Sequence, residues 1–389
     1  MLNLQGLKVN IFNSDVAPMV LSLTMYETIK GNLRGSMTLL DNVNFMDVFL
    51  GTTHAPIEIK WAYQGEAWVN HFYGDGIEKI EIMKSGKQYT IHFVSYTTLN
   101  EHTKVINNVY TGTSDQIIHN IFKEACGDDT DAPFITDSIA VTKGRYIVPN
   151  ITANKAISNV LNTSYDETTS GLFLYQRVCE QNITRLSSLK YMDTNFFYRR
   201  ALDEGSAKET MYTLKAAVAG ASAEDSGIDP EKTIGTTPGF IVDEYNMNFT
   251  AKLAQGTYGQ KVQNIELDKT SSLDFEGVEI DKKPKTSFPL STSLYEDNVK
   301  SVFSTSCGPE AYFAANQKRR VYNQRVTAPD VIAVPGLGCG YAIGIEQGGS
   351  NLSNNHKTDT KYVIANITHK FVMSDGKHRY TQDIGLVRE

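Results

Sequence analysis

The feature that most constrains the fold is an alternating stretch at the end of the chain, residues 361–389. Apolar residues from Val363 to Met373 fall on one face of a strand, and mostly polar residues fall on the other. Asp375-Gly376 follows, and a second apolar alternation begins at Tyr380. Because Gly adopts the positive φ that a tight turn needs, alternation broken by Asp-Gly predicts a β-hairpin.

A similar pattern occurs earlier, over residues 77–95. Ile80 and Ile82 alternate with charged residues, a turn follows at Gly86, and the return strand carries Tyr89. In both stretches the alternation is followed by Gly-Lys, then by Tyr-Thr, and then by further alternation. The spacing from Gly to Tyr differs by one residue, which a loop can absorb.

A second pair of stretches supports the first. Residues 20–41 end in Leu-Asp, and so do residues 241–268. An early and a late β unit thus share two features in the same order, which indicates internal duplication of one antiparallel module. The alternative is that hairpins resemble each other by chance. We interpret the following residues as structural turns: Gly31, Gly35, Gly86, Gly256, Gly259, Asp375 and Gly376.

These patterns predict a mainly β protein with α+β insertions, containing two similar antiparallel β-barrel domains of tube type. The first barrel is expected over residues 1–105, where short strands recur between turn residues. A small α+β domain follows over 106–202, with helices after Ser114 and after Thr152. A loop-rich linker follows over 203–238. The second barrel is expected over 239–268 and 330–389, interrupted by a helical insertion over 269–329.

Composition excludes several classes of protein. The net charge of −7 argues against general nucleic-acid binding. No run of 18 apolar residues exists, so we expect no membrane span, and the N-terminus lacks the pattern of a secretory signal. The four cysteines, Cys126, Cys179, Cys307 and Cys339, form no CxxC pair and suggest neither a disulfide framework nor a zinc site.

Four features of the sequence are candidates for chemistry, and none predicts an active site. Residues 336–340 carry three glycines but lead into a period-two strand, so a turn is favoured over a dinucleotide site. His369 and His378 lack a third metal ligand at a suitable spacing. Residues 128–131 lack the ligand pattern of a calcium loop, and the basic run 318–320 is too short for a nucleic-acid patch. We therefore expect no catalytic residues, no cofactor, no metal and no enzymatic activity.

Several stretches resemble a known family. Residues 23–35 resemble the opening of the central baseplate hub proteins of contractile-tailed bacteriophages, the tail hub or late-control protein D-like superfamily. Residues 334–337, 341–345 and 362–381 resemble the second barrel of those proteins, and residues 147–174 are similar in layout. The resemblance covers most of the chain but is diffuse.

The resemblance implies a structural virion protein. Members form a homotrimeric ring with pseudo-sixfold symmetry, which carries a trimeric tail spike on one face and meets the hexameric tail tube or tube-initiator proteins on the other. The tape measure protein is a further expected partner, and DNA passes through the lumen without specific binding. The expected location is the centre of the tail baseplate, after assembly in the host cytoplasm.

Two other functions stay open from the sequence. One is a hub component of a related contractile injection or secretion system. The other is a tail-associated cell-wall hydrolase, which would need paired Glu and Asp side chains in a cleft.

Overall fold

The computed structural model describes most of the chain and leaves several segments outside its description. The described residues are 5–45, 47, 54–63, 66–84, 86–127, 132–141, 143–162, 164–168, 170–195, 212–216, 233–242, 260–265, 270–275, 285–287, 324–332, 336–346, 360–374 and 377–388. Among them, no helix has the length and apolar character needed to cross a membrane.

The N-terminal strands form one side of a 14-stranded sheet. They enclose a core that includes Trp61, Phe72 and Phe93, all nearly inaccessible to solvent. The elements are β1 (Gln5–Ile11), β2 (Ser14–Asp15), η1 (Ala17–Met19), β3 (Val20–Thr28), β4 (Gly31–Asp41), β5 (Pro56–Tyr63), β6 (Glu66–Met83) and β7 (Gly86–Ser95). Buried and part-exposed residues alternate along β7, as expected for a strand with one face on a core.

Helices and short strands follow β7 and form a separate core around Ile117, Phe122 and Val160. The helix predicted after Thr152 is present, and the helix predicted from Ser114 has Thr113 as its N-cap in a capping box. The elements are α2 (Tyr96–Thr103), β8 (Val105–Thr113), α3 (Ser114–Cys126), β9 (Phe134–Thr136), β10 (Lys143–Thr152), α4 (Ala153–Leu161), β11 (Leu172–Gln176), η2 (Val178–Glu180), β12 (Thr184–Ser188) and α5 (Leu189–Asn195).

The remaining strands lie on the other side of the large sheet or in a small sheet of their own. β13 (Thr213–Ala216), β14 (Thr233–Thr237), β15 (Ile241–Val242), β19 (Gln324–Val331), β20 (Ala342–Glu346), β21 (Thr360–Ser374) and β22 (Lys377–Arg388) belong to the large sheet. β16 (Gln260–Ile265), β17 (Thr270–Phe275) and β18 (Lys285–Ser287) form a three-stranded sheet.

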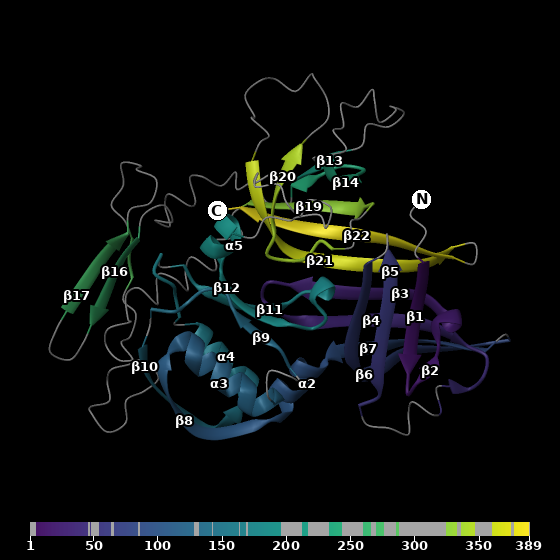
Figure 1. Ribbon diagram of the computed structural model, residues 1–389, viewed down its shortest axis with the longest axis horizontal. Helices are drawn as coiled ribbons and strands as arrows, with labels where there is room; N and C mark the ends of the chain where they lie inside the picture. The colour runs from purple at the N-terminus through teal and green to yellow at the C-terminus, as the bar shows by residue number, and fades with distance from the viewer. Residues whose placement is uncertain are drawn as a thin grey trace.

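The hairpin predicted at the C-terminus is confirmed, and it connects the two sides of the large sheet. β21 pairs with β22 from Val363 to Ser374. Near its start β21 also pairs with β20, and further along it pairs with β3. In Figure 1 the yellow hairpin lies between the purple N-terminal strands on one side and β13, β14 and β19 on the other. Phe371 belongs to the first core, whereas Ile364 and Ile367 belong to the second.

One strand order occurs twice in the large sheet. In the first half, neighbouring strands run β3, β4, β7, β6, β5, and in the second half they run β15, β19, β22, β21, β20. Each set uses its five strands in the same chain order, and every neighbouring pair is antiparallel. The hairpin β6–β7 therefore corresponds to the hairpin β21–β22.

The register repeats along with the order. Tyr89 and Tyr380 are each the fourth residue of the returning strand, and both are buried. The eighth residue of each returning strand faces a small residue, Gly35 in β4 and Ala328 in β19. The sequence pattern paired residues 20–41 with residues 241–268 and so predicted the counterpart of β4 near residues 262–267. In the structure the counterpart of β4 is β19, some sixty residues later. β16, which covers most of 262–267, pairs with β17 and β18 instead.

The prediction of two closed barrels is not met by the described strands. The first set ends at β2, where no further strand of the described chain continues the sheet. In the second set, β14 reaches the end of β19 through one isolated bridge, Thr236 to Ile332, in place of a ladder. In place of two separate barrels, the described strands form one 14-stranded sheet, whose two halves share the hairpin β21–β22.

Other segments also differ from expectation. The segment expected to be a linker, 203–238, contains β13 and β14, whose Leu214 and Ile234 are buried in the second core. The expected helical insertion, 269–329, contains β17, β18 and most of β19 among its described residues. Pairing with β20 and β22 overrides the weak local signals.

The predicted turn glycines have different places in the structure. Gly31 begins β4, and Gly86 begins β7 with φ of 144°, directly after a two-residue turn. Gly35 lies inside β4, where a Cβ atom would collide with the Thr24 carbonyl and the Phe93 ring. It is therefore a close-approach position and not a turn. Gly256, Gly259, Asp375 and Gly376 lie outside the described residues.

Candidate functional site

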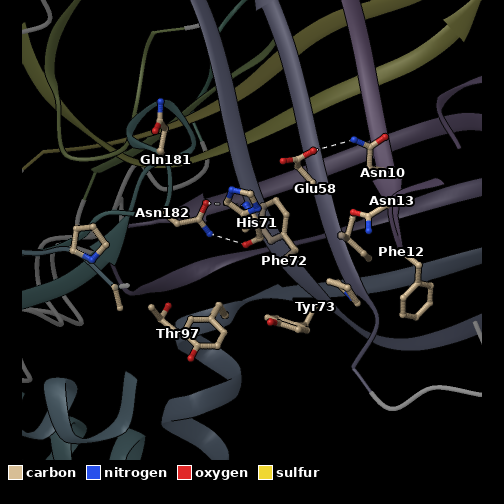
Figure 2. A pocket seen from close by; sticks show the side chains of 15 residues that line it. Asn10, Phe12, Asn13, Glu58, His71, Phe72, Tyr73, Thr97, Gln181 and Asn182 are labelled. Carbon is tan, nitrogen blue, oxygen red and sulfur yellow. Dashed lines mark hydrogen bonds between the residues drawn. The ribbon is translucent and has the colours of Figure 1, made fainter. Parts of the chain in front are cut away.

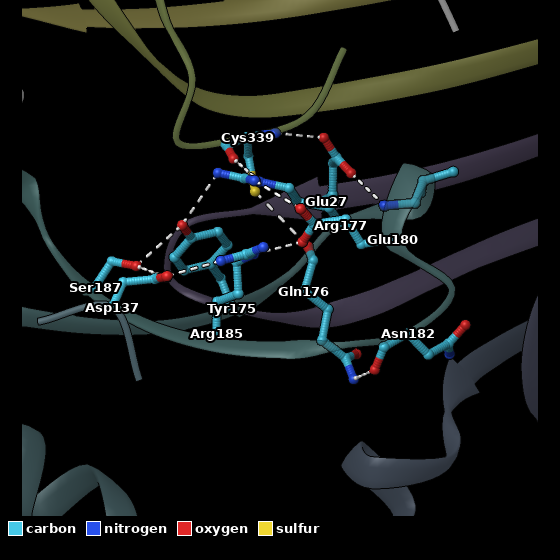
Figure 3. Close-up of polar contacts among 11 residues, drawn as sticks. Glu27, Asp137, Tyr175, Gln176, Arg177, Glu180, Asn182, Arg185, Ser187 and Cys339 are labelled. Atoms are coloured by element: carbon cyan, nitrogen blue, oxygen red, sulfur yellow. Dashed lines mark hydrogen bonds and ion pairs between the residues drawn. The ribbon is translucent and has the colours of Figure 1, made fainter. Parts of the chain in front are cut away.

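A buried polar junction joins three parts of the chain that are far apart in sequence (Figure 3). Glu27 of β3 is fully buried, and its carboxylate accepts hydrogen bonds from the backbone N–H groups of Val178 (2.7 Å) and Cys339 (2.6 Å). The first half of the sheet, the segment after β11 and the loop before β20 thus meet at one side chain. Charge-assisted bonds to backbone N–H groups compensate a carboxylate for the loss of water.

Arg177 lies beside Glu27 and is equally buried. Its Nε donates to the carbonyl of Cys339 at 2.7 Å, and its Nη1 donates to Glu180 at 2.9 Å. The guanidinium lies 4.1 Å from the centre of the Tyr341 ring, and its Nη2 contacts the hydroxyl of Tyr175. Burial alone would lower the pKa of Arg177, but the neighbouring Tyr175, Tyr341 and Glu180 raise it, so the side chain stays charged.

The network continues from Glu180 into the strand pair β11–β12. Arg185 bonds Glu180 at 2.6 Å and Asp137 at 2.8 Å, and Ser187 donates to Asp137. Burial would raise the pKa of Glu180, but Arg177 and Arg185 together lower it, so the carboxyl is ionised. Arg177, Glu180 and Arg185 therefore each have an opposite charge and directed hydrogen bonds, which a buried ion pair needs to be tolerated.

His369 of β21 closes the junction from the other side. Gln382 Nε2, which can only donate, lies 2.8 Å from the Tyr380 hydroxyl, and that hydroxyl lies 2.6 Å from His369 Nδ1. This chain of donors makes Nδ1 an acceptor, so we assign the ring proton to Nε2. Nε2 lies 3.7 Å from Glu27 Oε2, which is too long for a hydrogen bond, and has no hydrogen-bond partner among the described residues. The hairpin therefore packs beside the carboxylate that binds the other two segments.

The chemistry of this junction is that of a rigid connection. Its two arginines are paired with carboxylates, Glu27 accepts two bonds from backbone N–H groups, and the groups of Figure 3 face one another. Within the described ranges, no group of three or more His, Cys, Asp or Glu is placed to hold a metal ion. Buried hydrogen-bonded networks restrict the arrangement of the segments that they connect.

A cleft of about 600 Å³ lies between the edge of the N-terminal strands and the helices and short strands that follow β7, residues 96–195. Figure 2 shows Asn182 reaching across it to β6. The Asn182 side chain accepts from His71 N at 3.2 Å and donates to His71 O at 2.8 Å, as a neighbouring strand would. Phe12, Asn13, Gln181 and Asn182 at its border all have positive φ.

The carboxylate of the cleft is not arranged for acid–base catalysis. Glu58 is the acidic residue among the described residues that line it. A hydrogen bond from Lys60 lowers the pKa of Glu58, with help from Asn10, so the carboxyl is ionised at neutral pH. A glycosidase needs a second carboxyl group within about 10 Å and one that stays protonated.

The structure places the candidate residues of the sequence analysis as follows. Residues 336–340 form the turn that was predicted, and β20 follows them. His369 is fully buried, and a ring nitrogen of His378 lies 3.1 Å from the carbonyl oxygen of Val20. Cys126, Cys179 and Cys339 are free thiols. Cys307, residues 128–131 and residues 318–320 lie outside the described residues.

Sequence reasoning missed Glu27 and Arg177, the two centres of the junction. Glu27 lies at a position of β3 where the alternation calls for an apolar residue, between the buried Met25 and Ile29. That break in the pattern was the available signal. Arg177 carried no comparable signal, because it lies at the start of an irregular stretch between two short strands.

No family model and no curated protein matches the chain. Several solved structures match the chain in fold. The tail protein from Neisseria meningitidis MC58 has a TM-score of 0.58 at 8% identity, over 98% of this chain and 96% of that one. The 43 kDa tail protein of prophage MuSo2 from Shewanella oneidensis has a TM-score of 0.59 at 9% identity, over 98% of both chains.

A secretion-system protein has the same fold. The E. coli c3393 protein, described as a type VI secretion component similar to the T4 tail proteins gp27 and gp5, has a TM-score of 0.53 at 10% identity. That match covers all of this chain and 77% of the other. At such identities the similarity establishes the fold alone. The chain therefore has the fold of these phage tail proteins and of this type VI secretion component.

Proposed function

We propose that the protein is a structural subunit of the central hub of a phage tail. It acts as a homotrimer at the centre of the baseplate, where it joins a trimeric spike to the sixfold tail tube. The proposal includes that the protein is structural and not an enzyme. The domain boundaries at 105, 202, 238 and 330 stay predictions within it.

The observation that carries this proposal is the repeated strand order within one chain. Two sets of five strands, with the same order, direction and register, are the product expected of internal duplication. Three chains with two such units each present six similar positions, which suits contact with threefold and sixfold partners. The match to phage tail proteins over almost the whole chain supports the same role.

The buried junction fits this role as well. A hub subunit transmits load between a spike and a tube, so its parts need a fixed relative position. Glu27 and Arg177 connect the first half of the sheet, the segment after β11 and the loop before β20 through directed hydrogen bonds. In the assembled ring, DNA passes through the lumen, and the net charge of −7 disfavours binding of its phosphates.

The test is the mass and symmetry of the purified protein. Light scattering should give three times the chain mass of 43.2 kDa, alone or with the spike protein of the same tail. Electron-microscope class averages of the particle should show a ring with six similar lobes. A particle without threefold symmetry contradicts the proposal.

A hub in a related secretion system is the second candidate, because the E. coli c3393 protein shares the fold. The two roles differ in the partner, a tail tube in a virion or the tube of a secretion machine. Detection of the protein in purified virions by mass spectrometry decides between them. A cell-wall hydrolase is disfavoured by the single ionised carboxylate of the cleft, and a zymogram against peptidoglycan tests it.

A further inference from the structure

The two strand sets meet within the chain at one strand-to-strand joint. β3, the first strand of the first set, pairs antiparallel with β21 over seven residues of each strand. β21 is the fourth strand of the second set, and its other edge is occupied by β22. The outer edge of β3, the first strand of its set, thus pairs with the edge of β21 that β22 leaves free.

The equivalent edge of the first set is open. β6 corresponds to β21, and β5 pairs with its first part as far as Tyr73. Gly74 still donates to Ala55 at 2.9 Å, but from Asp75 to Met83 no described strand lies on this edge. The open stretch carries three exposed apolar side chains, Ile80 at 49%, Ile82 at 83% and Met83 at 41%.

The outer edge of the second set is open too. β15 corresponds to β3, and among the described strands it pairs with β19 alone. Ile241 of β15 is 53% exposed. Unpaired strand edges with apolar side chains are templates for pairing, and proteins rarely leave them uncovered. Among its described strands, each chain therefore has an open edge on β6, which corresponds to β21, and an open edge on β15, which corresponds to β3.

The repeated register shows which residue of β6 would face a partner. At the joint within the chain, Thr368 of β21 pairs with Asp383, the seventh residue of β22. The seventh residue of β7 is His92, which pairs with Gly76 of β6. Gly76 therefore occupies the place of Thr368.

The same count identifies the residue of β15. Tyr26 of β3, which faces Thr368, pairs with Arg34, and Arg34 faces the ninth residue of β7. Ile241 of β15 pairs with Thr327, which faces the ninth residue of β22. Ile241 therefore occupies the place of Tyr26.

We propose that the open edge of β6 pairs antiparallel with β15 of a second copy of this chain, with Gly76 opposite Ile241. The contact between subunits then repeats the β3–β21 joint within the subunit. It is a head-to-tail contact between two different surfaces, which closes into a ring when the rotation fits. This contact gives the trimer of the proposed function its interface and rests on that function.

Cysteine cross-linking tests the register. The variant carries Gly76→Cys and Ile241→Cys, and a Cβ atom at Gly76 meets no atom within 4 Å. Residues directly opposite on antiparallel strands have Cβ atoms about 5 Å apart, within reach of a disulfide after a small shift. Mild oxidation should give covalent dimers and trimers of the 43.2 kDa chain on a non-reducing gel.

The control places the same pair at the joint that exists within the chain. Tyr26→Cys with Thr368→Cys should form a disulfide at the equivalent register without any increase in mass. Each single variant controls for Cys126, Cys179, Cys307 and Cys339. Absence of cross-links in a protein that light scattering shows to be trimeric overturns this contact and leaves the proposed function standing. A protein that is monomeric at all concentrations, both alone and with the spike protein, contradicts both.

Discussion

Glu101 gives the sharpest prediction about stability. It lies on α2, is 3% exposed, and accepts one hydrogen bond from Asn32 of β4 at 3.1 Å. Its Oε1 has no hydrogen-bond partner among the described residues. Burial raises the pKa of Glu101 to about 8 from an ordinary 4.5, and the bond from Asn32 only partly opposes this. The carboxyl is therefore protonated in the folded protein at neutral pH.

The sign of the pH effect follows from the direction of the shift. Between pH 4.5 and 8 the folded protein keeps a proton that the unfolded chain releases, so stability falls as pH rises through this window. Each pH unit above 4.5 lowers the free energy of unfolding by about 1.4 kcal/mol, so about 3 kcal/mol is lost by pH 7. Glu101→Gln is neutral at every pH and has nearly the same shape, so it should lack this dependence.

The assay is urea unfolding at pH 5, 6, 7 and 8, followed by tryptophan fluorescence. The two tryptophans, Trp61 and Trp68, are buried in the first core, which α2 adjoins. The free energy of unfolding of Glu101→Gln minus that of the natural chain should rise by about 3 kcal/mol from pH 5 to pH 8. Glu58→Gln is the control, because the pKa of Glu58 is lowered and its effect lies below this window. Parallel pH curves for Glu101→Gln and the natural chain would refute the reasoning.

Three further predictions concern the sheet and the junction. Gly35→Val should lower the free energy of unfolding by 3 kcal/mol or more, because its side chain meets backbone, whereas Gly31→Ala should cost less than about 1 kcal/mol in the same urea titration. Glu27→Leu leaves two buried N–H groups without an acceptor and should cost about 2–6 kcal/mol, with Glu27→Gln in between, measured by urea unfolding. Phe371→Ala removes a fully buried ring next to Trp61 and should cost about 3–5 kcal/mol, with a changed tryptophan emission of the folded state. Full stability in any of these core variants would contradict the packing described here.

The sequence predicted the elements whose signal is local. Both hairpins were recognised from alternation and turn residues, and the Tyr-Thr pairs that linked them occupy equivalent register positions in the structure. The helices expected after Ser114 and after Thr152 were predicted from their apolar spacing, although the first begins one residue earlier, with Thr113 as its N-cap. These signals depend on residues within one turn or one strand, so a single sequence carries them.

The parts that depend on distant pairing could not be predicted in this way. β13 has four residues, and only its neighbours β14 and β20 make it a strand. The counterpart of β4 was sought directly after β15, but about eighty residues separate β15 from β19. Turn chemistry does not reveal that two segments so far apart are neighbours. The buried charges of Glu27 and Arg177 are acceptable only because three remote segments supply their partners.

The hairpin that belongs to both halves of the sheet has a consequence for biosynthesis. Phe371 and Tyr380 complete the N-terminal core, although more than 250 residues separate them from the end of β7. Domains generally fold as they are made, N-terminal first, but here the first half must wait until β21 and β22 have been synthesised. A chain that ends before β21 therefore lacks part of its earliest core. In the proposed trimer, this order of synthesis should exclude incomplete subunits from assembly.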